Sequence, residues 1–225
     1  MTRDAAIADF LDREGWGRAE PRPLAGDASA RRYERLARGG ARAILMDMPP
    51  ASGLDLRPFL AVTAWLRAGG FSAPEVLAAD GGAGLVLLED LGDDLFATLC
   101  AVQPAREAGL YGAAVDLLAD LQHRPPPGTE VGWTPPPYDR PFLLREARLA
   151  VEWYLPAASG QPIGTDLLAE YEALTVAAFA PLAEGPAVPV LRDYHAENLL
   201  WLPRRQRHAR VGMLDYQDML LGHPA

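Results

Sequence analysis

The sequence contains no lysine, so all 21 of its Lys-or-Arg positions are arginines. Its 30 Asp and Glu residues leave a formal net charge of −9. Binding to a nucleic-acid backbone depends on an excess of basic side chains that neutralise phosphates. We therefore expect no nucleic-acid partner.

Cysteine is almost absent, with Cys100 as its single example. One thiol cannot build an internal disulfide framework or supply the thiolates of a zinc site. The sequence has no run approaching the ~18 apolar residues that a membrane-spanning helix requires. Residues 1–10 also lack the pattern of a secretory leader. We therefore expect a protein of the reducing cytoplasm that does not enter a membrane.

Apolar residues make up 49% and charged residues 23% of the 225 positions, values typical of a globular protein. In residues 1–91, helical spacing over 4–15 is followed by short apolar segments bounded by Gly, Pro and Asp, which predict strands. The predicted strands are residues 21–24, 31–36, 43–48, 75–79 and 85–89. A helix over 56–68, ended by Gly69 and Gly70, is predicted between the third and fourth strands.

Residues 92–225 have mainly helical spacing, interrupted by a proline-rich segment over 125–137 that is expected to be a surface loop. The predicted helices are residues 105–123, 140–155 and 165–182. The predicted fold class is therefore α+β. We expect a five-stranded antiparallel N-terminal lobe of residues 1–91 and a helical C-terminal lobe of residues 92–225.

Three polar residues in the last part of the sequence suggest chemistry. Asp193 and Asn198 lie between the apolar runs 188–191 and 211–214, and Asp215 directly follows the second run. A rigid scaffold can aim side chains at strand ends toward a common point. Phosphoryl transfer needs a carboxylate that orients the attacking hydroxyl and oxygen ligands that hold Mg²⁺ on the phosphates. Asp193, Asn198 and Asp215 can supply these groups.

Longer motifs around these residues resemble a known family. The sequence DYHAEN at 193–198 and LDYQD at 214–218 is similar to the catalytic and metal-binding loops of aminoglycoside phosphotransferases, a branch of the protein-kinase-like superfamily. GDASARRY at 26–33, MDMPP at 46–50 and LEDLG at 88–92 resemble segments of bacterial cell-wall sugar kinases. This resemblance implies a two-lobed protein-kinase-like fold that binds Mg²⁺ and ATP between its lobes. It also implies phosphorylation of the anomeric hydroxyl of N-acetylmuramate or N-acetylglucosamine.

The resemblance also implies roles for individual residues. Asp193 would be the catalytic base, and Asn198 and Asp215 would bind Mg²⁺. The hinge residues Glu89 and Leu91 would present their backbone to the adenine edge. A turn of small residues would cover the nucleotide phosphates and let backbone amides approach the anion. That turn consists of Gly26, Asp27, Ala28 and Ser29.

The sequence departs from the family pattern at the phosphate-binding lysine. Met46 occupies the third-strand position where relatives have that lysine, and segment 56–68 has no glutamate to pair with it. Arg31, Arg32 or Arg42 could supply the positive charge, because a guanidinium binds phosphate through two donors. Among these we favour Arg32.

Relatives continue with further helices beyond the position that corresponds to Ala225. The resemblance therefore implies that the C-terminal lobe lacks helices that close one wall of the acceptor pocket.

Three further residues are candidates for substrate contact. Glu146 could hydrogen-bond a sugar, or it could belong to a solvated helix face. His195 could contact the substrate, or it could hold its own loop by hydrogen bonds. The family resemblance makes Asp218 a candidate on the substrate side of the cleft.

These observations together predict an enzyme, an ATP- and Mg²⁺-dependent kinase whose small-molecule partner is an amino sugar of peptidoglycan recycling. Two alternatives stay open. One is a kinase for an aminoglycoside, choline or another sugar. The other is a nucleotide-binding pseudokinase, which the missing lysine and glutamate would favour.

Overall fold

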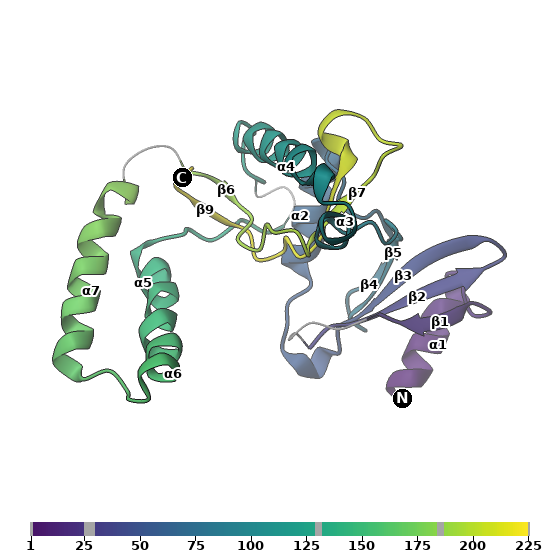
Figure 1. Cartoon of the computed structure of the whole chain (residues 1–225). Helices are drawn as coiled ribbons and strands as arrows, with labels where there is room; N and C mark the ends of the chain where they lie inside the picture. Colours follow the sequence, from purple (N-terminus) through teal and green to yellow (C-terminus); the bar gives the residue numbers. More distant parts are fainter. Residues whose placement is uncertain (1, 25–29, 129–131, 184–186, 225) are drawn as a thin grey trace. The chain divides into compact units, whose positions relative to one another are not determined.

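The computed structural model (Figure 1) describes residues 2–24, 30–128, 132–183 and 187–224. The chain divides into two compact units, which we call the sheet unit and the helical unit. The sheet unit comprises Met1–Asp120, Pro127–Thr134 and Asp193–Asp218. The helical unit comprises Leu121–Pro126, Pro135–Arg192 and Met219–Ala225. The functional division at residue 91 stays a prediction.

A five-stranded sheet dominates the N-terminal part of the sheet unit. Its strands follow the order β1-β2-β3-β5-β4, and every adjacent pair is antiparallel. They are β1 (Glu20–Pro23), β2 (Arg32–Arg38), β3 (Ala41–Asp47), β4 (Val76–Asp80) and β5 (Leu85–Glu89). Each begins and ends within about two residues of the segment predicted for it. The predicted five-stranded antiparallel sheet is therefore confirmed.

One face of the sheet is buried against helix α1 (Arg3–Arg13). Because successive side chains of a strand point to opposite faces, alternate residues of the central strands contribute to this layer. Leu45 of β3 lies directly opposite Leu87 of β5, with Leu85 two residues away on the same face. These side chains form a buried cluster with Phe10 of α1, which is only 1% exposed. The predicted N-terminal helix thus completes the core of this layer.

Helix α2 (Arg57–Ala68) is inserted between β3 and β4, as predicted. The hydroxyl oxygen of Thr63 on its buried face lies 2.8 Å from that of Tyr216. The rings of Phe59 and Tyr216 also stack, with 5.8 Å between their centroids. These contacts fix the helix to the residue that follows Asp215 in the chain.

The remainder of the sheet unit contains one complete helix, most of a second helix and a short pair of strands. They are α3 (Phe96–Val102), α4 (Glu107–Gln122) and the antiparallel pair β7 (Leu199–Trp201) and β8 (Val211–Met213). Helix α4 confirms the prediction over 105–123, whereas α3 and β7 were not predicted. Both are short apolar segments without enough length to establish a periodicity.

The helical unit contains two longer helical stretches and one strand pair. The first stretch runs through α5 (Arg140–Leu149), a π-helical turn (Ala150–Tyr154) and α6 (Leu155–Ser159); the second is α7 (Thr165–Phe179). Strand β6 (Val188–Val190) pairs with β9 (Leu220–Gly222), which was not predicted. The helices predicted over 140–155 and 165–182 are confirmed. The described helices include none long and apolar enough to cross a membrane.

The buried cluster beneath α1 yields a stability prediction. Leu45 is 1% exposed, so Leu45→Ala should lower the free energy of unfolding by about 2–5 kcal/mol through lost burial and a residual cavity. Urea denaturation followed by circular dichroism measures this change. Leu77→Ala on β4 is the matched control, because Leu77 is 47% exposed and its truncation should cost far less. Equal losses in the two variants would contradict the assignment of this core.

Candidate functional site

The loop that carries Asp193 is held in a compact turn by its own hydrogen bonds. The Asn198 side-chain amide donates to the Asp193 carbonyl oxygen at 3.0 Å, and the Asn198 backbone amide donates to the His195 carbonyl at 2.9 Å. The Tyr194 hydroxyl donates to the Ala114 carbonyl of α4 at 2.7 Å. Burial raises the pKa of Tyr194, so this phenol stays protonated and available as a donor. The Asp193 side chain is exposed.

The loop that carries Asp215 lies beside this turn. The Leu214 backbone amide donates to the Asn198 carbonyl oxygen at 2.9 Å, which continues the pairing of β7 with β8 by one further bond. Two of the three predicted residues, Asn198 and Asp215, therefore come from adjacent backbone segments. Asp215 has a φ of +55°, an uncommon left-handed conformation for a residue with a side chain.

Gln217 is a polar residue of this site to which the sequence analysis gave no role. Its side chain is 5% exposed, and its amide nitrogen donates to Asp215 Oδ1 at 2.6 Å and to Asp218 Oδ2 at 3.3 Å. The amide thus links the predicted metal ligand to the predicted substrate residue Asp218, which is exposed. The available signal in the sequence was its place in the LDYQD motif, between Asp215 and Asp218.

An arginine from the N-terminal sheet region reaches Asp215. Arg31 Nη1 lies 3.4 Å from Asp215 Oδ1, and the Arg31 side chain is 11% exposed. Arg32, which the sequence analysis favoured for the phosphates, is exposed at the start of β2. Arg42 is 57% exposed and lies 3.5 Å from Asp90. Met46, which the family resemblance aligns with the phosphate-binding lysine, is fully buried.

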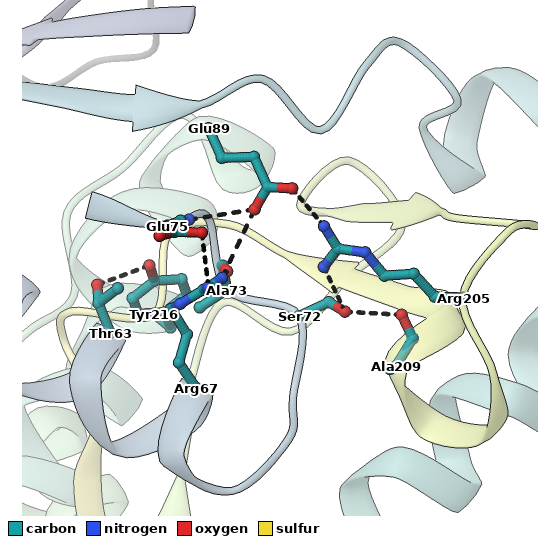
Figure 2. Close-up of polar contacts among 9 residues, drawn as sticks. All are labelled: Thr63, Arg67, Ser72, Ala73, Glu75, Glu89, Arg205, Ala209 and Tyr216. Atoms are coloured by element: carbon teal, nitrogen blue, oxygen red, sulfur yellow. Dashed lines mark hydrogen bonds and ion pairs between the residues drawn. The ribbon is translucent and has the colours of Figure 1, made fainter. Parts of the chain in front are cut away.

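The acidic side chains of Glu89 and Asp90 hold the predicted hinge, residues 89–91. The Asp90 side chain is 3% exposed, with Oδ2 at 2.9 Å from Arg35 Nε and Oδ1 accepting the Gly92 backbone amide at 2.9 Å. Glu89 is held by Arg205 and Arg67 (Figure 2). Within the described ranges, the Leu91 amide and carbonyl form no hydrogen bond. The predicted phosphate turn of Gly26, Asp27, Ala28 and Ser29 lies outside the described residues.

Glu146 lies on α5 in the helical unit and is bound by protein groups. The Arg192 guanidinium donates to Glu146 Oε1 at 2.7 Å, and the Tyr138 hydroxyl donates to Oε2. Burial and the neighbouring Glu146 carboxylate raise the pKa of Tyr138 to about 12, so the phenol remains a donor. Arg192 also lies 5.1 Å above the Phe142 ring. Glu146 thereby holds the residue that precedes Asp193 in the chain.

His195 is exposed, and its Nε2 lies 3.2 Å from the Asn198 side-chain nitrogen. This contact supports the role that the sequence analysis offered as its alternative, a hydrogen bond within the loop. Substrate contact by His195 stays a prediction.

The oxygen atoms of this site fit a magnesium ion that is shared with phosphates. The Asn198 amide nitrogen is used within the loop, which leaves its oxygen as the free acceptor. Asp215 adds a carboxylate, and Mg²⁺ is commonly held by one or two such groups together with substrate phosphates. Among the described residues, no group of three or more His, Cys, Asp or Glu side chains could hold a metal without such help.

Comparisons with known proteins place the chain in a family. It matches the model of the phosphotransferase enzyme family over residues 20–225. It is 41% identical over 259 aligned positions to the N-acetylmuramate/N-acetylglucosamine kinase of Caulobacter vibrioides, covering 99% of this chain and 69% of that kinase. It is 33% identical over 222 positions to the kinase of the same name from Pseudomonas aeruginosa, covering 97% of this chain and 62% of that kinase. The chain thus spans about two thirds of the length of these relatives.

Solved structures with the same fold include an ADP-bound aminoglycoside phosphotransferase, APH(2'')-Ib. Its TM-score is 0.63 at 14% identity, covering 98% of this chain and 73% of that chain. Choline kinase LicA from Streptococcus pneumoniae has a TM-score of 0.60 at 12% identity, covering 98% and 70% of the two chains. At these identities the likeness concerns the fold alone. By its sequence and its kinase-like fold, the chain belongs to the phosphotransferase enzyme family.

Proposed function

We propose that this chain carries the nucleotide-binding and catalytic part of a cytoplasmic kinase for cell-wall amino sugars. The reaction would move the γ-phosphate of ATP to the anomeric hydroxyl of N-acetylmuramate or N-acetylglucosamine during peptidoglycan recycling. The observation that carries the proposal is the bond between Leu214 and Asn198, which sets the Asn198 and Asp215 loops side by side. The two bacterial relatives named for this activity support the choice of acceptor.

Asp193 is the residue proposed to act on the acceptor. Its exposed carboxylate can accept the hydroxyl proton while the hydroxyl oxygen forms a bond to the γ-phosphorus. The bond from that phosphorus to the bridging oxygen breaks in the same reaction, and ADP leaves with the electron pair. Mg²⁺ held by the Asn198 oxygen and the Asp215 carboxylate would neutralise charge on the phosphates.

Arg31 is proposed to replace the lysine that relatives use on the phosphates. Its side chain is largely buried, and its guanidinium lies beside Asp215, where a metal-bound phosphate would be held. A guanidinium offers several donors in a fixed plane, so it can contact Asp215 and a phosphate oxygen from one position. Arg32 and Arg42 are more exposed, which makes them weaker candidates for this role.

The hinge is proposed to bind the adenine edge through Leu91. Its amide and carbonyl have no partner among the described residues, whereas the Glu89 amide is already bonded to the Glu75 carbonyl at 2.8 Å. An adenine base offers a complementary acceptor and donor on one edge. The Glu89 side chain then serves to hold the hinge and does not itself meet the base.

The proposed reaction is tested by removing the acceptor-side carboxylate. Asp193→Asn should lower kcat by about 10²- to 10⁴-fold, because the amide cannot accept the hydroxyl proton. ATP affinity should stay close to that of the parent. Phosphate transfer from ATP is measured with N-acetylmuramate and N-acetylglucosamine, beside an aminoglycoside and choline. Glu197→Gln, an exposed carboxylate in the same loop, is the matched control and should retain activity. A parent rate in Asp193→Asn would refute the assignment.

The role of Asp215 can be separated from its backbone conformation. Both Asp215→Asn and Asp215→Ala should abolish the enhancement of ATP binding by Mg²⁺, measured by calorimetry with and without the metal. Because Asp215 has a φ of +55°, alanine should cost about 1–2 kcal/mol of stability that asparagine largely avoids. Thermal unfolding of the two variants measures this difference. Undiminished Mg²⁺ dependence in Asp215→Asn would exclude this residue as a metal ligand.

The proposal for Arg31 predicts an unequal effect of two neighbouring arginines. Arg31→Met should weaken ATP binding by about 1.5–3 kcal/mol, about tenfold or more, through loss of a charged hydrogen bond. Arg32→Met should have a much smaller effect, because Arg32 is exposed. Titration calorimetry with ATP and Mg²⁺ compares the two variants. The reverse order of losses would restore Arg32 as the phosphate-binding residue.

A further inference from the structure

A polar network surrounds the carboxylate of Glu89 at the end of β5 (Figure 2). Arg205 binds Oε1, while the backbone amide of Glu75 donates to Oε2 at 3.2 Å. Arg67 Nη1, on α2, lies 3.6 Å from the same Oε2, and Arg67 Nη2 donates to Glu75 Oε2 at 2.9 Å. Both oxygens of Glu89 are therefore held by groups from different elements.

Arg205 connects this carboxylate to the segment between β7 and β8. Its second nitrogen donates to the Ser72 hydroxyl at 2.8 Å, and that hydroxyl donates to the Ala209 carbonyl at 2.7 Å. The Ser72 carbonyl then accepts the Met213 backbone amide at 3.0 Å. Met213 is the last residue of β8, two positions before Asp215. One guanidinium thus links the predicted hinge to the strand that leads to the predicted metal ligand.

The hinge also rests directly on β8. A Cβ atom at Gly212 would lie 3.2 Å from the Leu91 side chain and 3.1 Å from that of Leu202, so this strand approaches the hinge closely. On the other side, Asp90 is bound by Arg35. Successive residues of an extended segment point in opposite directions, so Glu89 and Asp90 hold the hinge from two sides.

The exposure of the pair argues for a geometric role. The Arg205 and Glu89 side chains are 32% and 29% exposed, and single ion pairs at such sites contribute little to stability. A guanidinium held by two fixed partners nevertheless has one defined position, and the group that it binds is positioned with it. Loss of the pair should therefore displace the hinge more than it destabilises the fold.

We propose that Arg205 is a positioning residue that, through Glu89, sets the hinge for the adenine of ATP. The inference rests on the proposed function, because it assigns this network to the nucleotide end of that site. Arg205 touches neither nucleotide nor acceptor in this proposal. Arg205 affects only the position of the Leu91 backbone relative to β8.

Removal of the guanidinium tests the proposal. Arg205→Met should weaken ATP binding and raise the KM for ATP by about tenfold, with kcat and the KM for the amino sugar changed by less than about threefold. Calorimetry with ATP and Mg²⁺ and steady-state transfer assays supply these values. A general loss of structure would lower kcat and affect both substrates, so the separation of the two KM values is the decisive readout. Arg204→Met, an exposed neighbour, is the matched control.

Two further variants keep the test decisive. The double variant Glu89→Gln/Arg205→Met should lose no more ATP affinity than the single variants, because both remove the same contact. Arg205→Lys keeps the positive charge but cannot contact Glu89 and Ser72 through two separate nitrogens, so its ATP affinity should lie between those of the parent and Arg205→Met. It replaces Arg205→Met in the test if that variant does not fold. If Arg205→Met or Arg205→Lys folds and its ATP affinity stays within about twofold of the parent, the inference about Arg205 is refuted while the proposed function stands. A parent protein that bound no ATP would refute the proposed function, and this inference with it.

Discussion

The pairing of β7 with β8 is the constraint on which the rest of the candidate site depends. Leu199 lies opposite Met213, and Trp201 lies opposite Val211. The next bond, from Leu214 to Asn198, extends this pairing into the two loops. Since backbone hydrogen bonds fix the register of an antiparallel pair, the loops cannot slide past one another. The site is thus defined by main-chain geometry before any side chain contributes.

The sequence predicted most of the architecture because the longer helices have helical spacing and the strands of the large sheet are bounded by turn residues. These two signals located all five strands of the large sheet and the helix between β3 and β4. The strands β7 and β9 were missed because a segment of three residues is too short to show a period. Helix α3 was missed for a similar reason, since its seven residues are almost uniformly apolar.

The site residues were found from their motif, but their partners were not. Arg31 and Arg32 are adjacent, and only the direction of the chain entering β2 decides which of them lies near Asp215. The partners of Glu146 come from positions 138 and 192, which no local pattern connects. Gln217 was visible in the motif, yet its contacts with Asp215 and Asp218 depend on the turn between them. Sequence motifs therefore identified the candidate site residues, whereas strand register and turns determine which side chains contact them.

The link between Arg205 and Glu89 has a consequence for how this protein can vary. The connector from β7 to β8 turns at an exposed stretch that includes Pro203 and Arg204. Arg205 itself is anchored on both sides, by Glu89 and by Ser72. An insertion or deletion that shifted Arg205 would break both contacts at once. Relatives that keep the contact between Arg205 and Glu89 should consequently also keep the length of this surface turn, although the turn and the hinge lie far apart in the sequence.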